Sequence, residues 1–148
     1  MKTLGIGDTT MKLNVMLDDN AYLPKRAHEA DAGLDLFSPV RVCIWKHDCV
    51  MIDTGVHVEI PKGYVGFLKS KSGLNVKHGI RGEGVIDSGY TGSIVVKLYN
   101  DSPRNYHIEE GDKIIQLVIL PIPEVELQIV DKFEETDRGD NGFGSTGR

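Results

Sequence analysis

The residues best suited to chemistry lie in one short run, Gly84–Gly92, where an acid, a phenol and several glycines stand between two apolar segments. Asp87 follows two apolar residues, which places its carboxylate at the end of a strand. Tyr90 could lay its flat ring against a ligand, and glycines let the backbone approach a ligand closely. The β-branched residues on both sides predict a hairpin. The alternative is an ordinary turn with a solvated Asp87.

The C-terminal stretch 137–148 is a second candidate, with four glycines, two arginines and one aromatic residue. Hydroxyls, exposed N–H groups and a bidentate cation are what a phosphate site needs. Phe143 between glycines could stack on a base. The Walker pattern is absent, because no Gly-Lys-Ser/Thr follows. Without periodicity the stretch should be disordered by itself and order on a ligand as a lid, unless it is only a flexible tail.

Three further sites fall in the body of the chain. Asp35 alternates with leucines in a short strand, so its carboxylate is either a surface acid or a group that reaches a metal-bound water. Lys71 opens a polar loop into a predicted helix at 73–78, ended by Gly79. A helix N-terminus favours phosphate, although a plain N-cap explains the serines equally well. Gln116, alone in a long apolar run, must be hydrogen-bonded within the core or face a site.

The elements that position these residues are predicted to be strands. Alternation or short apolar runs separated by Pro and Gly turns indicate an all-β sandwich or barrel with one short helix. The predicted strands cover 12–17, 33–36, 41–45, 49–52, 56–60, 64–68, 84–86, 94–100, 113–120 and 125–130.

Length and composition fit a single domain of 148 residues. We expect an N-terminal extension at 1–11, a β core at 12–131 and a C-terminal lid arm at 132–148. A net charge of −5 and a pI near 5.5 argue against a nucleic acid polymer as partner, but not against a nucleotide. With no long apolar run, no signal-peptide pattern and two cysteines, we expect a cytoplasmic protein with reduced thiols and without a zinc site or membrane partner.

Taken together, these runs resemble the five ordered motifs of the trimeric deoxyuridine triphosphate nucleotidohydrolases, the dUTPases. The resemblance covers about residues 12–148. Its counterparts are 32–36, 71–74, 84–87 with Tyr90 and Gly92, 111–117, and 138–147. Three positions depart from the family pattern. Lys71 and Thr91 stand where Arg is usual, and Ile115 replaces a frequent Ala. Lys71 keeps the charge but loses the planar fork of Arg.

The resemblance implies a homotrimer of jelly-roll-like β subunits with active sites shared between subunits. The reaction would convert dUTP and water to dUMP and diphosphate, which removes dUTP from the nucleotide pool and supplies dUMP for dTMP synthesis. Asp87 would orient and deprotonate the attacking water. Mg²⁺ would be held mainly by the substrate phosphates, with Asp35 binding one of its waters.

The same resemblance assigns the remaining contacts with the nucleotide. Tyr90 would pack under the deoxyribose and exclude a 2′-hydroxyl. Backbone groups of Gly84, Val85, Ile86 and Val95 would pair with uracil. The phosphates would meet Lys71, Ser72, Gly73 and Gln116. A neighbouring subunit's arm would close over the nucleotide with Arg138, Phe143, Gly144, Ser145 and Thr146.

Three rival interpretations stay open at this point. A dCTP deaminase shares the family's fold, and Glu83 is the only acid immediately beside the expected hairpin. A nucleotide-sensing regulator would use the same pocket but act through a partner. A plain structural β module would leave the C-terminal motif unexplained.

Overall fold

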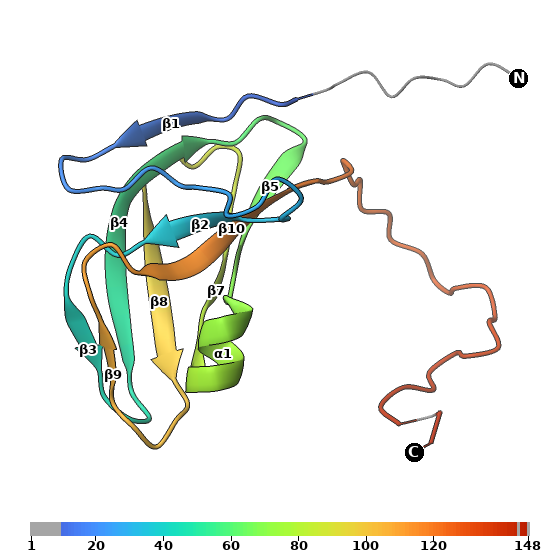
Figure 1. Cartoon of the computed structure of the whole chain (residues 1–148). Coiled ribbons are helices and arrows are strands. Elements are labelled where there is room, and N and C mark those ends of the chain that lie inside the picture. Colours follow the sequence, from blue (N-terminus) through green and yellow to red (C-terminus); the bar gives the residue numbers. More distant parts are fainter. Residues whose placement is uncertain (1–9, 145, 148) are drawn as a thin grey trace, which may run out of the picture.

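The computed structural model describes residues 10–144 and 146–147. Two four-stranded sheets, ordered β1-β4-β8-β6 and β2-β10-β5-β7, and a two-stranded pair β3-β9 form its body (Figure 1). The elements are β1 (Asn14–Leu17), β2 (Leu34–Phe37), β3 (Val42–Ile44), β4 (Cys49–Glu59), β5 (Tyr64–Lys69), α1 (Ser72–His78), β6 (Ile80–Arg81), β7 (Glu83–Ile86), β8 (Ser93–Asn100), β9 (Tyr106–Ile108) and β10 (Lys113–Pro121). The expected all-β fold with one short helix is confirmed.

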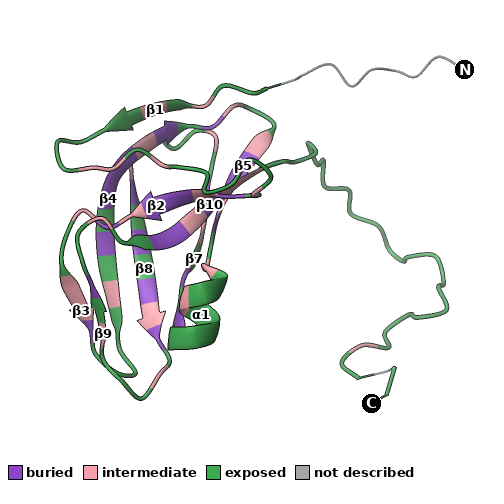
Figure 2. Ribbon diagram, in the orientation of Figure 1, coloured by how far each residue is buried: buried purple, intermediate pink, exposed green. Residues whose placement is uncertain are grey.

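The core lies between the two large sheets, where their buried strand segments meet (Figure 2). β8 shows the alternation expected of a strand with one face in the core, since Ile94, Val96 and Leu98 are buried and the residues between them are exposed. On β10 the apolar Ile115 and Leu117 likewise point into the core. Because successive side chains of a strand point to opposite faces, Gln116 between them faces outward. The same alternation turns Asp35 away from the core position of Leu36.

The long strand β4 joins two predicted strands, 49–52 and 56–60, into one. A register shift between Asp53 and His57 marks a bulge in its pairing with β8. Gly55 takes a φ of 66° there, and the Asp53 carboxylate accepts a hydrogen bond from its N–H at 3.0 Å. A positive φ suits glycine because it has no Cβ. Beyond the bulge, His57 pairs with Ser93 of β8, and the last residues of the strand pair with β1.

Helix α1 begins at Ser72 and ends at His78, within one residue of the prediction. Lys71 is the N-cap residue with an extended backbone, and no side chain caps the helix. Gly79 ends the helix with a φ of 68°, and its N–H bonds to the carbonyls of Leu74 and Asn75. This is the left-handed C-terminal cap that glycine favours. At seven residues, this helix of the described part of the chain is too short to cross a membrane.

The predicted hairpin between 84–86 and 94–96 is wrong. β7 pairs with β5, and β8 pairs with β4 and, at its far end, with β6. The β-branched residues predict strands correctly, but alternation does not say which strand becomes the partner. The connection Asp87–Gly92 therefore crosses from one sheet to the other.

The predicted strand at 125–130 is also wrong within this chain. Those residues are irregular, and Leu127 and Ile129 keep 91% and 99% of their surface exposed. A strand needs a partner for its backbone hydrogen bonds, and no described segment of this chain supplies one there. After Pro121 the chain runs away from the body (Figure 1). Of the expected extension at 1–11, residues 1–9 lie outside the described residues.

Candidate functional site

The buried carboxylate of Asp35 is the centre of the site. The residue is 4% exposed although it sits on the outer face of its sheet. The Lys71 ammonium contacts its Oδ1 as an ion pair. The Lys113 Nζ lies 3.2 Å from its Oδ2, within ion-pair distance but outside hydrogen-bond geometry. Two cations on one carboxylate leave a net positive charge, which favours an anionic ligand.

Gln116 stands directly opposite Asp35 across β2 and β10. Its Nε2 donates a hydrogen bond to the Ser70 carbonyl at 3.1 Å. Its Oε1 lies where a side chain at Gly33 would go, 2.5 Å from the position of a Cβ. The choice left open by the sequence is therefore settled, because the amide is bonded at the outer face rather than satisfied within the core.

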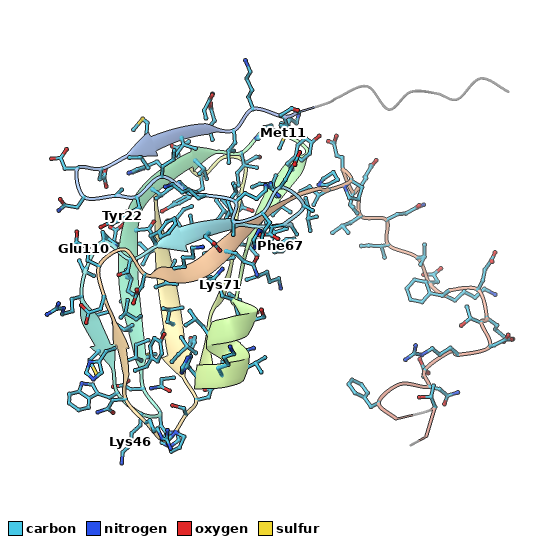
Figure 3. All side chains as sticks on the ribbon, in the orientation of Figure 1. Met11, Tyr22, Lys46, Phe67, Lys71 and Glu110 are labelled. Atoms are coloured by element: carbon cyan, nitrogen blue, oxygen red, sulfur yellow. The ribbon has the colours of Figure 1, made fainter. Side chains whose placement is uncertain are left out.

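These groups line a polar cavity of about 340 Å³ between β2, β10 and the start of α1. Figure 3 shows Lys71 there, where the loop enters the helix. The cavity brings together residues of the first, second and fourth motifs. Its lining residues are Asp31, Ala32, Gly33, Asp35, Lys71, Ser72, Gly73 and Gln116. Lys113 contacts Asp35 from the side. The sequence analysis missed it, because strict alternation would place Lys113 on the core face with Ile115 and Leu117, and a register shift between Lys113 and Ile115 breaks that alternation.

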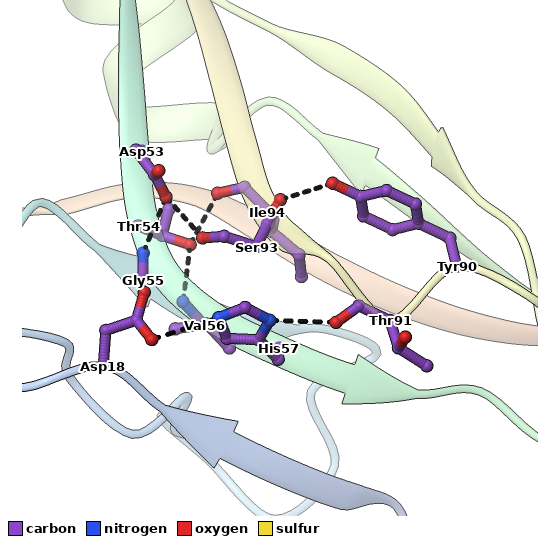
Figure 4. A network of polar contacts seen from close by, with 10 residues as sticks. All are labelled: Asp18, Asp53, Thr54, Gly55, Val56, His57, Tyr90, Thr91, Ser93 and Ile94. Carbon is purple, nitrogen blue, oxygen red and sulfur yellow. Dashed lines mark hydrogen bonds and ion pairs between the residues drawn. The ribbon is translucent and has the colours of Figure 1, made fainter.

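The third motif lies on β7 and in the turn that follows. Asp87 is exposed, and its carbonyl accepts a hydrogen bond from the Tyr90 N–H at 3.0 Å. The Tyr90 hydroxyl donates to the Ser93 carbonyl at 2.7 Å, which folds its ring back over the turn (Figure 4). A Cβ at Gly92 would lie 2.6 Å from that hydroxyl oxygen. Only glycine at this position leaves room for the ring.

Two strand edges next to this turn keep backbone groups unpaired within the described chain. β7 pairs on one side only, with β5. At Val95, β8 pairs with β4 alone, since β6 reaches only Tyr99 and Asn100. Free N–H and C=O groups on an edge can pair with the edge of a planar base. Gly84, Val85, Ile86 and Val95 therefore sit where backbone recognition of a base is feasible.

The third motif and the described residues of the C-terminal arm do not line the cavity around Asp35. In the arm, the Arg138 Nε donates to the Asn141 carbonyl at 2.9 Å. Phe143 is fully exposed with a φ of 45°, and Gly144 follows with a φ of 97°. Thr146 is exposed, and Ser145 lies outside the described residues. Within one copy of the chain, the residues expected to form one site thus lie in three separate places: the cavity around Asp35, the third motif and the C-terminal arm.

The described residues contain no group of three or more His, Cys, Asp or Glu side chains that could hold a metal ion. Asp35 is a single carboxylate, so it suits contact with a water of an ion that is bound mainly by a ligand. Hard oxygen contacts of this kind fit Mg²⁺, which usually retains several waters.

Comparison with known proteins agrees with this geometry. The family model described as dUTPase matches residues 19–147. A deoxyuridine 5′-triphosphate nucleotidohydrolase of Clostridium novyi is 41% identical over 141 residues, which cover 93% of this chain and 99% of that protein. The one from Cutibacterium acnes is 42% identical and covers 84% of this chain and 85% of its own. The chain belongs to the dUTPase family, as its five motifs predicted.

Solved structures extend the similarity to the whole fold. A mutant of the Staphylococcus bacteriophage 80alpha dUTPase with dUpNHpp matches with a TM-score of 0.88 and 36% identity, covering 94% of this chain and all of that one. A mutant dUTPase from phage phi11 of S. aureus, described as revealing the coordination of a structural Mg(II) ion, matches with a TM-score of 0.79 and 35% identity, over 84% of this chain and all of that one. The expected jelly-roll-like dUTPase fold is confirmed.

Proposed function

We propose that this protein hydrolyses dUTP to dUMP and diphosphate, and so removes dUTP from the nucleotide pool and supplies dUMP for dTMP synthesis. The observation that carries the proposal is the polar cavity beside the start of α1, where Asp35, Lys71 and Gln116 converge and Lys113 approaches Asp35 from the side. The two lysine ammonium groups beside Asp35 suit the oxygens of a triphosphate. Family membership supports the same assignment.

Asp87 is the residue proposed to orient the attacking water and accept its proton. Its carboxylate is exposed at the end of β7, where a water can reach it. Phosphoryl-transfer catalysis depends mostly on positioning and on stabilising charge, so a single well-placed carboxylate is sufficient as base. Attack of this water on the α-phosphorus would break its bond to the bridging oxygen, so that diphosphate leaves and the product keeps one phosphate on the nucleoside.

Selection of the nucleoside would fall to the third motif. The Tyr90 ring, folded back by its bond to Ser93, would pack under the deoxyribose and leave no room for a 2′-hydroxyl. The unpaired backbone edges at Gly84, Val85, Ile86 and Val95 would pair with uracil. A pocket that fits uracil closely would exclude the methyl group of thymine.

The phosphates would be held by Lys71, Ser72, Gly73 and Gln116. Asp35 would hold a water of a bound Mg²⁺, which supplies charge neutralisation on the triphosphate. Lys71 is already paired with Asp35. When the phosphates arrive, the lysine would have to share its charge between the carboxylate and the ligand.

The active site would be shared within a homotrimer. Support comes from the separation of the three parts in one chain, because the arm points away from the body instead of covering the cavity (Figure 1). Arg138, Phe143, Gly144, Ser145 and Thr146 would close over a neighbour's nucleotide, with Phe143 stacked on uracil.

The proposed division is an extension at 1–11, a core at 12–131 and a lid arm at 132–148. A cytoplasmic location is proposed too, supported by the unpaired thiols of Cys43 and Cys49.

The test compares the wild type with Asp87→Asn, which keeps the shape and removes the base. The variant should bind dUTP with nearly unchanged affinity by calorimetry and lose about 10²-fold or more in single-turnover hydrolysis. Turnover close to that of the wild type would remove Asp87 from the mechanism.

A second candidate function is regulation through a partner protein. It is favoured by a similar protein, the 80alpha dUTPase, whose description says that phage dUTPases control transfer of virulence genes by a G protein-like mechanism (TM-score 0.87, 37% identity). An arm that orders on nucleotide could present a different surface to a partner. Affinity capture with and without the non-hydrolysable analogue dUpNHpp would test it, since a regulator should exchange partners between the two states.

A further inference from the structure

The turn that carries Tyr90 is tied to the body by a group outside the five motifs, the imidazole of His57 on β4 (Figure 4). The ring nitrogen Nδ1 lies 2.9 Å from the Thr91 carbonyl oxygen. The other nitrogen, Nε2, lies 3.2 Å from Oδ1 of Asp18, in the loop after β1. One imidazole thus bridges the Tyr90 turn and the loop at Asp18.

Both partners of the ring are acceptors, and this decides its protonation state. A carbonyl oxygen can only accept, so Nδ1 must carry a proton. In the neutral ring Nε2 would then present a lone pair to a carboxylate, whereas both nitrogens donate in the imidazolium. Only the charged ring satisfies both contacts.

A second link, two residues further along the chain, ties the same end of this turn to β4. The Ser93 hydroxyl donates to the Asp53 carboxylate, which also accepts from the Gly55 N–H. The bulge is fixed in turn by Thr54, whose hydroxyl donates to the Ile94 carbonyl at 2.7 Å. Ser93 is also the residue whose carbonyl accepts the Tyr90 hydroxyl. Both links therefore anchor the C-terminal end of the turn, around Thr91 and Ser93, to the bulged segment of β4.

We propose that His57, as an imidazolium bridging Thr91 and Asp18, is a positioning residue that holds the Tyr90 turn in the geometry that discriminates deoxyribose from ribose. The inference rests on the proposed function, since it assigns sugar selection to Tyr90. His57 itself touches neither the tyrosine ring nor the cavity around Asp35. His57 acts by fixing the position of the Tyr90 ring.

Charged groups around the ring support the imidazolium. They are Asp18 after β1 and Asp53 and Glu59 on β4, while β1 and β8 contribute the uncharged Asn14, Met16 and Ser93. The hydrogen bond to the Thr91 carbonyl raises the pKa of His57 most, and desolvation opposes it as the second-largest effect. The hydrogen bond and charge of Asp18 and the charge of Asp53 then raise the pKa further, so that it lies above its ordinary value. A raised pKa keeps the bridge intact below the ordinary histidine value of about 6.5 and loosens it as the pH rises through the folded-state value.

The first experiment follows the bridge in the substrate-free protein by NMR between pH 5.5 and 9. The Thr91, Gly92 and Ser93 amide signals should titrate with the same midpoint as the His57 ring. Asp18→Asn should lower that midpoint, and the neighbouring Asp19→Asn should leave it in place. Amide signals that do not follow the ring, or a midpoint that Asp18→Asn does not lower, would overturn the proposal.

The second experiment measures kcat and KM for dUTP and UTP over the same pH range. The ratio of the two kcat/KM values should fall about 3- to 10-fold in the wild type as the bridge loosens, a loss within the range of one interaction. His57→Gln lacks the positive charge of the imidazolium and cannot titrate, so its ratio should stay low and flat. His107→Gln, an exposed histidine on β9, serves as the matched control and should keep the wild-type profile. Parallel profiles for wild type and His57→Gln would contradict the proposal.

Absence of dUTP hydrolysis would refute the proposed function instead, while the NMR result would still test the bridge.

Discussion

Asp35 and Gln116 face each other across β2 and β10, and because opposite residues of an antiparallel pair point to the same side, the carboxylate and the amide open into one cavity. Neighbouring residues Leu36, Ile115 and Leu117 turn inward to the core. The packing that stabilises the body thus also fixes the relative position of two groups that would bind the triphosphate. Substitutions around this pair and around Tyr90, and truncation of the arm, can test that arrangement.

Gly33→Ala should disturb Gln116 more than it disturbs the fold. An added Cβ would lie 2.5 Å from the Gln116 Oε1 and 3.0 Å from the Gln116 Cβ. The amide must swing away, which it can do at the end of a flexible side chain, and β10 must give by a few tenths of an ångström. We expect a fall of about tenfold in kcat/KM for dUTP, equal to about 1.4 kcal/mol, with a nearly unchanged melting temperature. In a Gln116→Ala background the same substitution should cost little, which a double-mutant cycle would measure. Equal losses in both backgrounds would mean that Gly33→Ala does not act through Gln116.

Lys113→Gln should weaken binding of the triphosphate without removing the fold. The substitution keeps a polar side chain, one bond shorter, and deletes a positive charge 3.2 Å from the Asp35 carboxylate. Since Lys113 is about half exposed, we expect only a several-fold rise in KM for dUTP, smaller at high salt, with little change in kcat. Steady-state kinetics at two ionic strengths would check this. Lys46→Gln, in the distant turn before β4 (Figure 3), should leave KM unchanged. An equal effect of both variants would mean that Lys113 acts only through net charge.

Gly92→Ala should reduce discrimination between dUTP and UTP. Its Cβ would overlap the Tyr90 ring, with contacts of 2.6 to 2.9 Å to the hydroxyl oxygen and ring carbons, so the ring must leave its bond to Ser93. We expect the ratio of kcat/KM values to fall by about tenfold. Gly89→Ala in the same turn meets no atom within 4 Å and should keep the ratio. A Gly92→Ala protein with full selectivity would show that the ring position in the free protein does not determine sugar choice.

Deletion of residues 138–148 should abolish most hydrolysis and spare the body. The described residues of this arm are exposed or, at Gly142, half-buried, and Phe143 is fully exposed, so their loss should not change the melting temperature. Loss of a lid that positions the substrate and excludes water costs on the order of 10²-fold in rate. Diphosphate release and thermal unfolding of the truncated protein test both statements. Full activity after truncation would mean that the arm is idle in catalysis.

The sequence predicts much of this fold because burial alternates along most strands. The helix at Ser72–His78 and most strands of the core follow from periodicity, from Gly and Pro positions and from residue types, whereas the five motifs follow from the resemblance to the family. The short strands β6 and β9 were not predicted. Strand pairing does not follow from such patterns, which is why β7 was expected beside β8 and is found beside β5. The segment 125–130 has the right alternation but lacks a partner strand among the described residues of this chain.

The site shows the same limit. Asp35 and Gln116 were predicted as candidates from their residue types, and their juxtaposition required the register of β2 with β10. Lys113 and His57 were missed, because a lysine before an apolar run and a histidine in an alternating strand look like ordinary surface residues. Their roles depend on long-range contacts, to Asp35 in one case and to Asp18 and Thr91 in the other.

Diphosphate release from dUTP with magnesium, measured beside UTP, dTTP and dCTP and beside the Asp87→Asn variant, tests the central claim most directly. We predict rapid release from dUTP by the wild type, little from the other three nucleotides, and loss of about 10²-fold or more in the variant. Ammonia release from dCTP would point to a deaminase instead. Bound dUTP without any diphosphate release by the wild type would contradict the account and leave regulation as the function of the site.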